Sequence, residues 1–323
     1  MSPSARSLEN PFDPKERDPD NAAFVENVLG SKKKGKRELK RKIVEGFGTE
    51  VDLHFSAEDR KRIEDEGIFG EIISRERQAL RNFFGKEISV PAIPKQATKE
   101  RILEWRALGF ELHYLPPISM AEIKRGEKGE ITEVTPIEFP GWKKKPGKRY
   151  ASGLSCIDFF DDIKAGKLSP LAINLPGAWI LIDAREKPSG LGEYPDDALA
   201  PALKELRKDG IVNDRNTKKE SRFDLSPREL ENPKVLEAFA KVLDFQTVSG
   251  LTVAIPRAME ANILGNIHYP QWDKSKDLEW FSDLYEKDGF RSCLYGGLSY
   301  ISLISPRKRL LNVGFRLIGR FSQ

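Results

Sequence analysis

Histidine, cysteine and acidic side chains are the groups in this sequence that could support metal or redox chemistry. The chain has three histidines, His54, His113 and His268, and each lies in a different sequence context. None belongs to a Cys/His cluster with metal-ligand spacing, so an iron or zinc site would need all three to converge in the fold. We therefore predict no metal site and no cofactor. His113, inside an alternating segment, is interpreted as a packed or surface histidine.

Nucleophilic and redox signatures are equally sparse. The two cysteines, Cys156 and Cys293, lie far apart and do not indicate a disulfide framework, which favours a reducing, cytoplasmic location. The chain has no Gly-rich phosphate loop, no Gly-x-Ser-x-Gly elbow and no zinc-protease helix. The acid pairs Asp161-Asp162 and Asp196-Asp197 are interpreted as solvated loop or helix-cap residues. These observations argue against the usual hydrolase and nucleotide-binding classes.

Charge is mild overall but locally concentrated. The 323 residues carry a net charge of +4, and 39% of them are hydrophobic. No apolar run approaches the ~18–20 residues that span a bilayer, and no secretory signal is visible, so we expect a soluble protein. Lys32–Lys42 holds eight basic residues and one acid. Together with the Lys143–Arg149 cluster it could grip phosphates, so a nucleic-acid-associated module stays open beside a basic linker.

Two segments are expected to precede the C-terminal domain. Residues 1–48 combine many charges with clustered prolines, which predicts a disordered basic tail. Residues 49–170 are expected to form a small accessory α+β domain. One or two helices are predicted between Ser56 and Phe84, and another begins at Thr98 and ends at Gly109.

Strands are predicted where apolar residues alternate or run together. Phe110–Leu115 alternates as a half-buried strand does, and Leu175–Asp183 indicates a turn followed by a buried strand. Gly126–Arg149, rich in Gly, Pro and Lys, is interpreted as an irregular connection. Further along, helices are predicted at Asp196–Lys208 and Ser226–Leu243, the second with serine as its N-cap and proline at its first position.

An aromatic group follows in the C-terminal part of the sequence. It suits either a sugar-binding or base-stacking surface or the packing of a core around short strands, and both alternatives stay open. Its members are Tyr269, Trp272, Trp280, Phe281 and Tyr285.

Four C-terminal segments occur in an order that resembles one known family. Ala254–Asn262 resembles the helix start "leucine-proline, then glutamate", and Leu278–Tyr285 resembles the segment "Trp-Glu-Trp-x-x-Asp-x-Tyr". Tyr295–Ser299 resembles the strand "Arg-Gly-Gly-Ser", and Val313–Ile318 the terminal strand "Ile-Gly-Phe-Arg-Leu-Val". These motifs belong to formylglycine-generating, or sulfatase-modifying-factor, domains. The resemblance implies a C-type-lectin-like domain over residues 171–323, an α+β fold of short twisted antiparallel strands and flanking helices.

The enzymatic branches of this family need side chains that the matching positions lack. The resemblance implies that the oxidases carry reactive cysteines, able to bind copper, just after the Gly-Gly pair. Leu298–Asn312 contains no cysteine, and Cys293 lies before the pair. The iron-dependent sulfoxide synthases need a histidine triad. We therefore predict that the protein is not an enzyme, with a formylglycine-generating-type oxidoreductase as the alternative.

A non-catalytic branch of the same fold, the variable proteins of diversity-generating retroelements, is the most similar in motif order. The resemblance implies that the stretch before the terminal strand is a hypervariable binding region on a constant scaffold. Pro306–Asn312 places cations beside adjacent leucines, as a contact surface would, and an ordinary basic loop is the alternative. The expected partner is a protein or glycan ligand.

Ligand contacts are predicted to centre on residues 291–312. Alternate side chains of a strand share a face, so positions 299, 301, 303 and 305 are expected to face the ligand. The expected scaffold residues are Trp280, Gly296, Gly297, Phe315 and Leu317. The predicted contact residues are Arg291, Ser292, Tyr295, Ser299, Ile301, Leu303, Ser305, Arg307, Arg309, Leu310 and Asn312.

Overall fold

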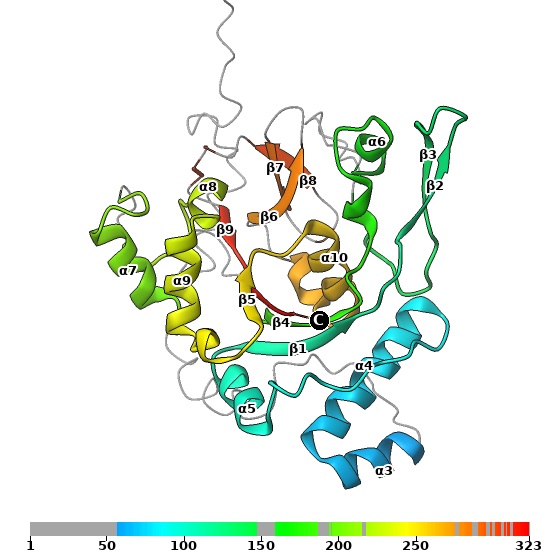
Figure 1. Ribbon diagram of the computed structural model, residues 1–323, viewed down its shortest axis with the longest axis horizontal. Coiled ribbons are helices and arrows are strands. Elements are labelled where there is room, and N and C mark those ends of the chain that lie inside the picture. Colours follow the sequence, from blue (N-terminus) through cyan, green and yellow to red (C-terminus); the bar gives the residue numbers. More distant parts are fainter. Residues whose placement is uncertain are drawn as a thin grey trace, which may run out of the picture. The chain divides into compact units, whose positions relative to one another are not determined.

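The computed structural model contains two four-stranded sheets and one two-stranded hairpin, with helices packed around the larger sheets (Figure 1). The structure describes residues 57–146, 159–186, 194, 196–214, 218–274, 278–285, 290–294, 298, 301–304, 307, 309–310 and 313–322. The tail predicted for residues 1–48, with its basic run Lys32–Lys42, lies outside these residues. Residues 47–323 form one compact unit.

The first helices follow the sequence prediction closely. Helices α3 (Ala57–Glu66) and α4 (Ile68–Phe84) occupy the segment for which one or two helices were predicted. Gly67, with φ of 59°, separates them, because it adopts a left-handed backbone angle that other residues disfavour. Helix α5 (Lys99–Ala107) begins where Thr98 accepts a hydrogen bond from the backbone N–H of Arg101 at 3.4 Å.

A four-stranded antiparallel sheet lies at the centre of the compact unit. Its order is β1 (Phe110–Leu115), β4 (Ala178–Asp183), β10 (Ile318–Phe321) and β5 (Leu251–Ala254). The two strands predicted from the apolar pattern, β1 and β4, are confirmed and pair with each other. All six positions of β1 are buried, however, so it is not the half-buried strand that alternation indicated.

The pairing of β1 with β4 bears on the domain organisation. Leu112 is the register partner of Leu181, and Ile182 in turn pairs with Ile318 near the end of the chain. Strand β1 belongs to the predicted accessory domain 49–170, and β4 to the predicted domain 171–323. Two strands that the prediction assigned to different domains therefore lie side by side in one sheet, inside one compact unit.

The second sheet contains the strands that hold the predicted binding region. Its order is β8 (Ile301–Ile304), β7 (Phe290–Leu294), β6 (Leu278–Tyr285) and β9 (Val313–Phe315). Strands β8, β7 and β6 are antiparallel neighbours, whereas β9 runs parallel to β6. The α+β class with small antiparallel sheets is confirmed.

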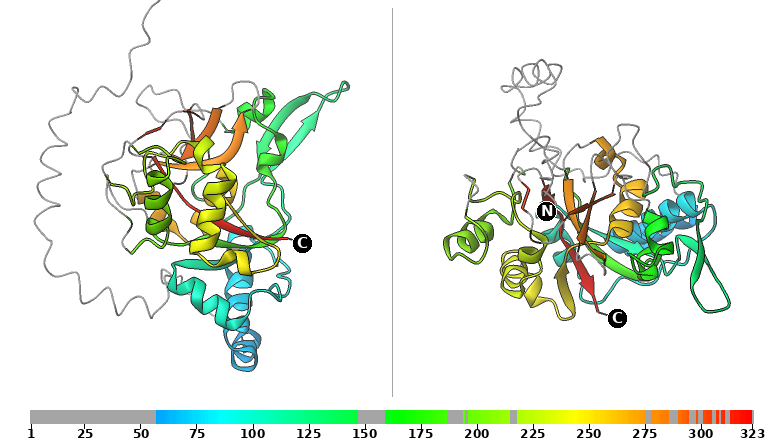
Figure 2. Two further views of the ribbon diagram at one scale, coloured as in Figure 1. Left: turned by 60° about the vertical axis from the view of Figure 1, so that its left-hand side comes forward. Right: turned by 90° about the horizontal axis from the view of Figure 1, so that it is seen from above.

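The segment Gly126–Arg149 is not simply the irregular connection that its composition indicated. Strands β2 (Ala121–Arg125) and β3 (Ile131–Pro136) form an antiparallel hairpin, which projects from the body in Figures 1 and 2. Gly129, with φ of 81°, allows the turn, and the backbone N–H of Gly126 donates to the carbonyl of Glu130 at 2.9 Å. Because both hairpin faces are largely polar or exposed, the sequence lacks the apolar alternation by which strands are recognised.

The helices of the C-terminal half differ from the prediction at their ends. The predicted helix Ser226–Leu243 is two helices, α8 (Pro227–Leu230) and α9 (Pro233–Val242), because Asn232 precedes a proline and serves as the N-cap of α9. Helix α7 (Ala200–Lys208) begins after the predicted start at Asp196, whose φ is 51°. The remaining helices are α6 (Phe159–Lys164), α10 (Ala258–Ile267) and the short 3₁₀ turns Pro170–Ile173 (η1), Phe245–Thr247 (η2) and Pro270–Lys274 (η3).

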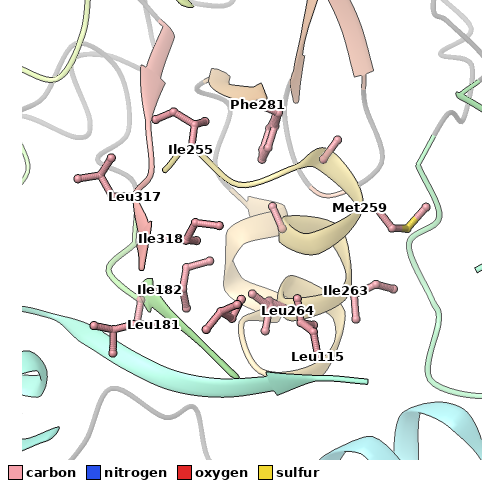
Figure 3. Packing of buried hydrophobic residues seen from close by; sticks show 14 of the residues in the cluster. Leu115, Leu181, Ile182, Ile255, Met259, Ile263, Leu264, Phe281, Leu317 and Ile318 are labelled. Carbon is pink, nitrogen blue, oxygen red and sulfur yellow. The ribbon is translucent and has the colours of Figure 1, made fainter. Parts of the chain in front are cut away.

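Helix α10 packs on one face of the central sheet. Ile182 of β4 and Ile318 of β10 point toward it, whereas Leu181 points to the opposite face (Figure 3). Ile263 and Leu264 of the helix are fully buried against this layer. Within the described part of the chain, no helix is both long and apolar enough to cross a membrane.

Candidate functional site

Strand β6 joins the family-like motif segments into one assembly. Its Trp280 pairs in register with Cys293 of β7 and with Phe315 of β9. The backbone N–H of Ala258, at the start of α10, donates to Asp283 of β6 at 2.5 Å. The segments that resemble the family at the start of α10, in β6 and in β9 therefore contact one another, although they are separate in the sequence.

The residues expected to be scaffold lie in the core where the structure describes them. Trp280, Phe315 and Leu317 are at most 1% exposed. The Trp280 indole N–H donates to the carbonyl of Leu225 at 2.9 Å, and the Phe315 ring stacks on Phe239 with centroids 5.4 Å apart. The other two expected scaffold residues, Gly296 and Gly297, lie outside the described residues.

Arg316 is a buried charged residue of the terminal motif segment. It lies between β9 and β10, and it is only 1% exposed. Its guanidinium donates to Glu279 at 3.1 Å and to the carbonyl of Arg185 at 2.8 Å, and it also bonds the carbonyl of Asp183. Its carbon Cζ lies 3.8 Å from the centre of the Trp272 ring. Arg316 therefore connects the two four-stranded sheets, through Glu279 of β6 and the carbonyl of Asp183 of β4.

The aromatic group is mainly part of the core. Tyr269, Trp272, Trp280 and Phe281 are between 1% and 4% exposed, and the Tyr269 and Trp272 rings stack with centroids 4.3 Å apart. The Tyr285 side chain lies outside the described part. The sequence left open whether this group forms a ligand-binding surface or packs in the core. These four residues pack in the core.

The predicted ligand-contact residues divide into three groups. Arg291 and Ser292 lie on β7, and Ile301 and Leu303 on β8, with Ser292 opposite Leu303 in the register; the structure does not describe their side chains. Arg307 and Arg309 are exposed, and Leu310 is half-buried. The remaining four, Tyr295, Ser299, Ser305 and Asn312, lie outside the described residues.

Arg307 and Arg309 line a polar cavity of about 500 Å³. The cavity wall also includes the turn after α7, Gly210–Asn213, and the start of α8. Arg309 binds the Glu229 carboxylate in a bidentate ion pair, with Nε–Oε2 and Nη2–Oε1 distances of 3.0 Å each. The sequence could not show this pairing, because the two residues come from segments far apart in the chain.

Glu229 is held firmly in this wall. It closes the capping box of α8 by accepting from the backbone N–H of Ser226 at 2.8 Å, and it also accepts from the N–H of Asn213 at 2.7 Å. Burial alone would raise the pKa of Glu229, but the hydrogen bonds from Arg309, Ser226 and Asn213 outweigh it and lower the pKa. The carboxylate is therefore ionised at neutral pH and fixes the position of Arg309.

The cavity wall carries an excess of positive charge. Arg228 and Arg307 also line it, and both are exposed. Neither pairs with a carboxylate among the described residues. The described lining thus holds three guanidinium groups and one carboxylate. Guanidinium matches planar oxyanions in both charge and geometry.

A larger cavity, of about 690 Å³, lies on a different part of the surface. It is mostly apolar and is lined by residues of η1, α8 and β6, among them Leu171, Leu230 and Phe281. The two arginines that line it, Arg257 and Arg320, are already bound to Glu260. Of the predicted contact residues whose side chains the structure describes, Arg307, Arg309 and Leu310, none lines it.

Two of the three histidines converge in the interior. His113 of β1 and His268, at the end of α10, have ring centroids 4.0 Å apart and ring planes tilted by 32°. Glu76 of α4 contacts both, with Oε1 at 2.9 Å from His113 Nδ1 and Oε2 at 3.3 Å from His268 Nε2. The three side chains are between 0% and 8% exposed, and their candidate ligand atoms lie within 4.8 Å of one another. The third histidine, His54, lies outside the described residues.

The sequence did not predict this cluster, because its carboxylate comes from the buried, apolar face of helix α4. His113 is buried, as its interpretation as a packed histidine allowed. Glu76, however, lies on α4 four residues after Ile72 and four before Leu80, both of which are buried. A glutamate on the apolar stripe of a helix is the one sequence signal that could have identified the cluster.

The basic cluster Lys143–Arg149 is partly engaged within the fold. Lys144 forms an ion pair with Asp273 at 3.1 Å, and Lys145 pairs with Glu138. Residues 147–149 lie outside the described part. These two lysines are therefore compensated by carboxylates rather than being left for phosphate.

No family model, curated protein or solved structure matches the chain.

Proposed function

We propose that the protein is a non-catalytic ligand-binding protein whose C-terminal part is a C-type-lectin-like domain of the sulfatase-modifying-factor type. The contact between the motif segments supports this proposal. The opening strand β4 pairs with the closing strand β10, and β6 carries both β7 and β9. In a scaffold built in this way, the segment between β8 and β9 lies outside the paired strands, so an exposed position such as Arg307 could vary without disturbing the core.

The observation that carries the binding proposal is the cationic cavity beside that segment. Arg307 and Arg309 come from the predicted contact residues, whereas Arg228 comes from α8. A site with two exposed guanidinium groups and a third fixed by Glu229 suits a carboxylate, sulfate or phosphate group. We therefore propose that the ligand is a protein or glycan that presents such a group.

The proposal includes the class of variable proteins of diversity-generating retroelements. In that class the variable residues precede the terminal strand, which is where β8 and Arg307–Leu310 lie relative to β9. The neighbouring DNA tests this part. A reverse transcriptase gene with a near-copy of the segment for residues ~285–318 is expected, and its absence in the source genome would count against the class while leaving anion binding untouched.

The binding test uses the full chain with heparin, polyglutamate and a DNA duplex as probes. We expect heparin or polyglutamate to bind, and Arg307→Ala and Arg228→Ala each to weaken binding by about tenfold or more, because each removes a charge-assisted hydrogen bond. Arg81→Ala is the matched control, since Arg81 is an exposed arginine on α4 that does not line the cavity. Isothermal titration at two salt concentrations gives the affinities.

Two outcomes would contradict the proposal. Equal affinities for the wild type and the two cavity variants would show that the cavity is not the binding site. Binding of DNA alone, with steep salt dependence and no effect of Arg307→Ala, would favour the nucleic-acid alternative. Melting temperatures within error of the wild type are required of both variants, because each side chain is exposed.

A further inference from the structure

We infer that Glu76, His113 and His268 bind one divalent metal ion of the Zn²⁺ and Co²⁺ class. Two imidazoles and one carboxylate form a ligand set that such ions take in proteins. The inference concerns the interior at α4, β1 and α10, and it does not depend on the proposed binding function.

The spacing of the ligand atoms fits an ion between them. Bonds of about 2.0–2.1 Å in a tetrahedron place neighbouring ligand atoms roughly 3.3–3.4 Å apart. Glu76 Oε1 lies 2.9 Å from His113 Nδ1, and Oε2 lies 3.3 Å from His268 Nε2. Since all the candidate atoms lie within 4.8 Å of one another, coordination requires movements of an ångström or so.

Neighbouring groups hold these side chains in the orientation that coordination needs. The Tyr269 hydroxyl lies 2.5 Å from His113 Nε2, so the proton of that ring can reside on Nε2 and leave Nδ1 free for a metal. Arg75 donates to Glu76 at 3.2 Å and to the carbonyl of Leu112 at 2.8 Å. The backbone N–H of Tyr114 donates to the second carboxylate oxygen of Glu76 at 3.2 Å.

Charge also favours a cation at this position. Glu76 and Glu111 both contact Arg75, so the groups in direct contact carry two carboxylates and one guanidinium. A buried negative charge without compensation is costly, and a bound cation removes that cost.

The ion would have a structural role. Its ligands come from residues far apart in the sequence, on helix α4, strand β1 and the end of helix α10. None of the three is more than 8% exposed, which leaves little access for a substrate. An ion held there cross-links α4 to the sheet and to α10, and we expect it to stabilise the fold.

The experiment measures Co²⁺ binding to the full chain after chelation. We expect one Co²⁺ per chain, with visible absorption bands of a site with nitrogen and oxygen ligands. Glu76→Gln and His268→Gln are each expected to weaken Co²⁺ binding by at least about tenfold, because each removes a ligand. Glu71→Gln is the matched control: it is the same change on the same helix, at an exposed side chain.

X-ray absorption of the Zn²⁺-loaded wild type decides the case if a variant fails to fold. Scattering from two imidazole rings and one carboxylate is expected. Chelated wild-type protein that binds no Co²⁺, or Glu76→Gln protein that binds it as tightly as the wild type, would overturn the inference. The cluster would then be a hydrogen-bonded network without a metal. An X-ray absorption spectrum of the Zn²⁺-loaded protein that lacks scattering from two imidazole rings would lead to the same conclusion.

Discussion

Arg222 and Asp183 form an ion pair in which neither side chain is exposed to solvent. The Arg222 Nη1 to Asp183 Oδ2 distance is 2.6 Å, and both side chains are 0% exposed. Arg185 donates to the same carboxylate at 2.7 Å, and Asp197 accepts from Arg222 at 2.6 Å. Asp183 ends β4, so this network fixes the end of the central sheet to the chain beyond α7.

Removing one partner from this network should be far more costly than removing a surface ion pair. Arg222→Met keeps much of the length of the side chain but leaves Arg185 to pair with both Asp183 and Asp197, so one of the two buried carboxylate charges is no longer balanced. We expect the free energy of unfolding to fall by about 3 to 5 kcal/mol, measured by urea denaturation of the full chain.

The matched comparison is the exposed pair of Lys124 with Glu133 on the β2–β3 hairpin, 2.7 Å apart. Glu133→Gln should leave the urea midpoint unchanged, because water already solvates both groups. If Arg222→Met shifted the midpoint no more than Glu133→Gln does, the buried network would not stabilise the fold.

Glu260 should make part of the stability depend on pH. Its carboxylate is buried at the start of α10 and accepts from Arg320 at 2.6 Å and from Arg257 at 3.0 Å. Burial alone would raise the pKa of Glu260, but hydrogen bonding to Arg320 and the positive charges of both arginines lower it. The ionised form is thus favoured by folding.

The sign of the effect follows from that lowered pKa. Because the folded pKa lies below the unfolded value of about 4.3, the stabilisation is complete above the unfolded pKa and is lost as the pH falls through the folded one. We expect Glu260→Gln to be destabilised by about 1 to 3 kcal/mol at pH 7 and to approach the wild type below about pH 4. Urea denaturation from pH 3 to 7 measures both proteins. A difference in the free energy of unfolding between the two proteins that stays constant from pH 3 to 7 would contradict the prediction.

Local sequence signals identified much of the secondary structure. The strands β1 and β4 follow from apolar runs, and the starts of α5 and α8 follow from Thr98 and Ser226, because caps and apolar runs act within a few residues. Asn232-Pro233 is also a local signal, which marks the end of one helix and the start of the next. The apolar pattern continues on both sides of it, and one helix was predicted across the break. The mixed α+β class could therefore be predicted, whereas the specific lectin-like fold stays a proposal.

Contacts between distant segments were not predictable from one sequence. The bidentate pair of Arg309 with Glu229 depends on how the segment before β9 passes α8. The convergence of Glu76 with His113 and His268 depends on α4 and α10 meeting beside β1. In each case the residue types are ordinary and their separation in sequence is large, so only tertiary packing brings them together.

Leu298, within the predicted binding segment 291–312, is held by helix α10 and by the turn η3. Asn262 donates to the carbonyl of Leu298 at 2.5 Å, and the backbone N–H of Leu298 donates to Asp273 at 3.0 Å. The Leu298 side chain is 3% exposed and lies directly over Gly265. A Cβ placed on Gly265 would lie 2.2 Å from Leu298 Cδ2 and 3.0 Å from its Cγ.

Gly265→Ala should therefore be destabilising, although alanine is the better helix former. The gain in helix propensity is about 1 kcal/mol, but the overlap with a leucine whose backbone is held on both sides should cost about 1 to 3 kcal/mol or more. In a Leu298→Ala background the overlap disappears, so the same Gly265→Ala change should become stabilising. Urea midpoints of the wild type, the two single variants and the double variant measure this reversal of sign. An equal effect of Gly265→Ala in both backgrounds would show that Leu298 does not rest on the helix at Gly265, and that α10 does not position the segment that follows.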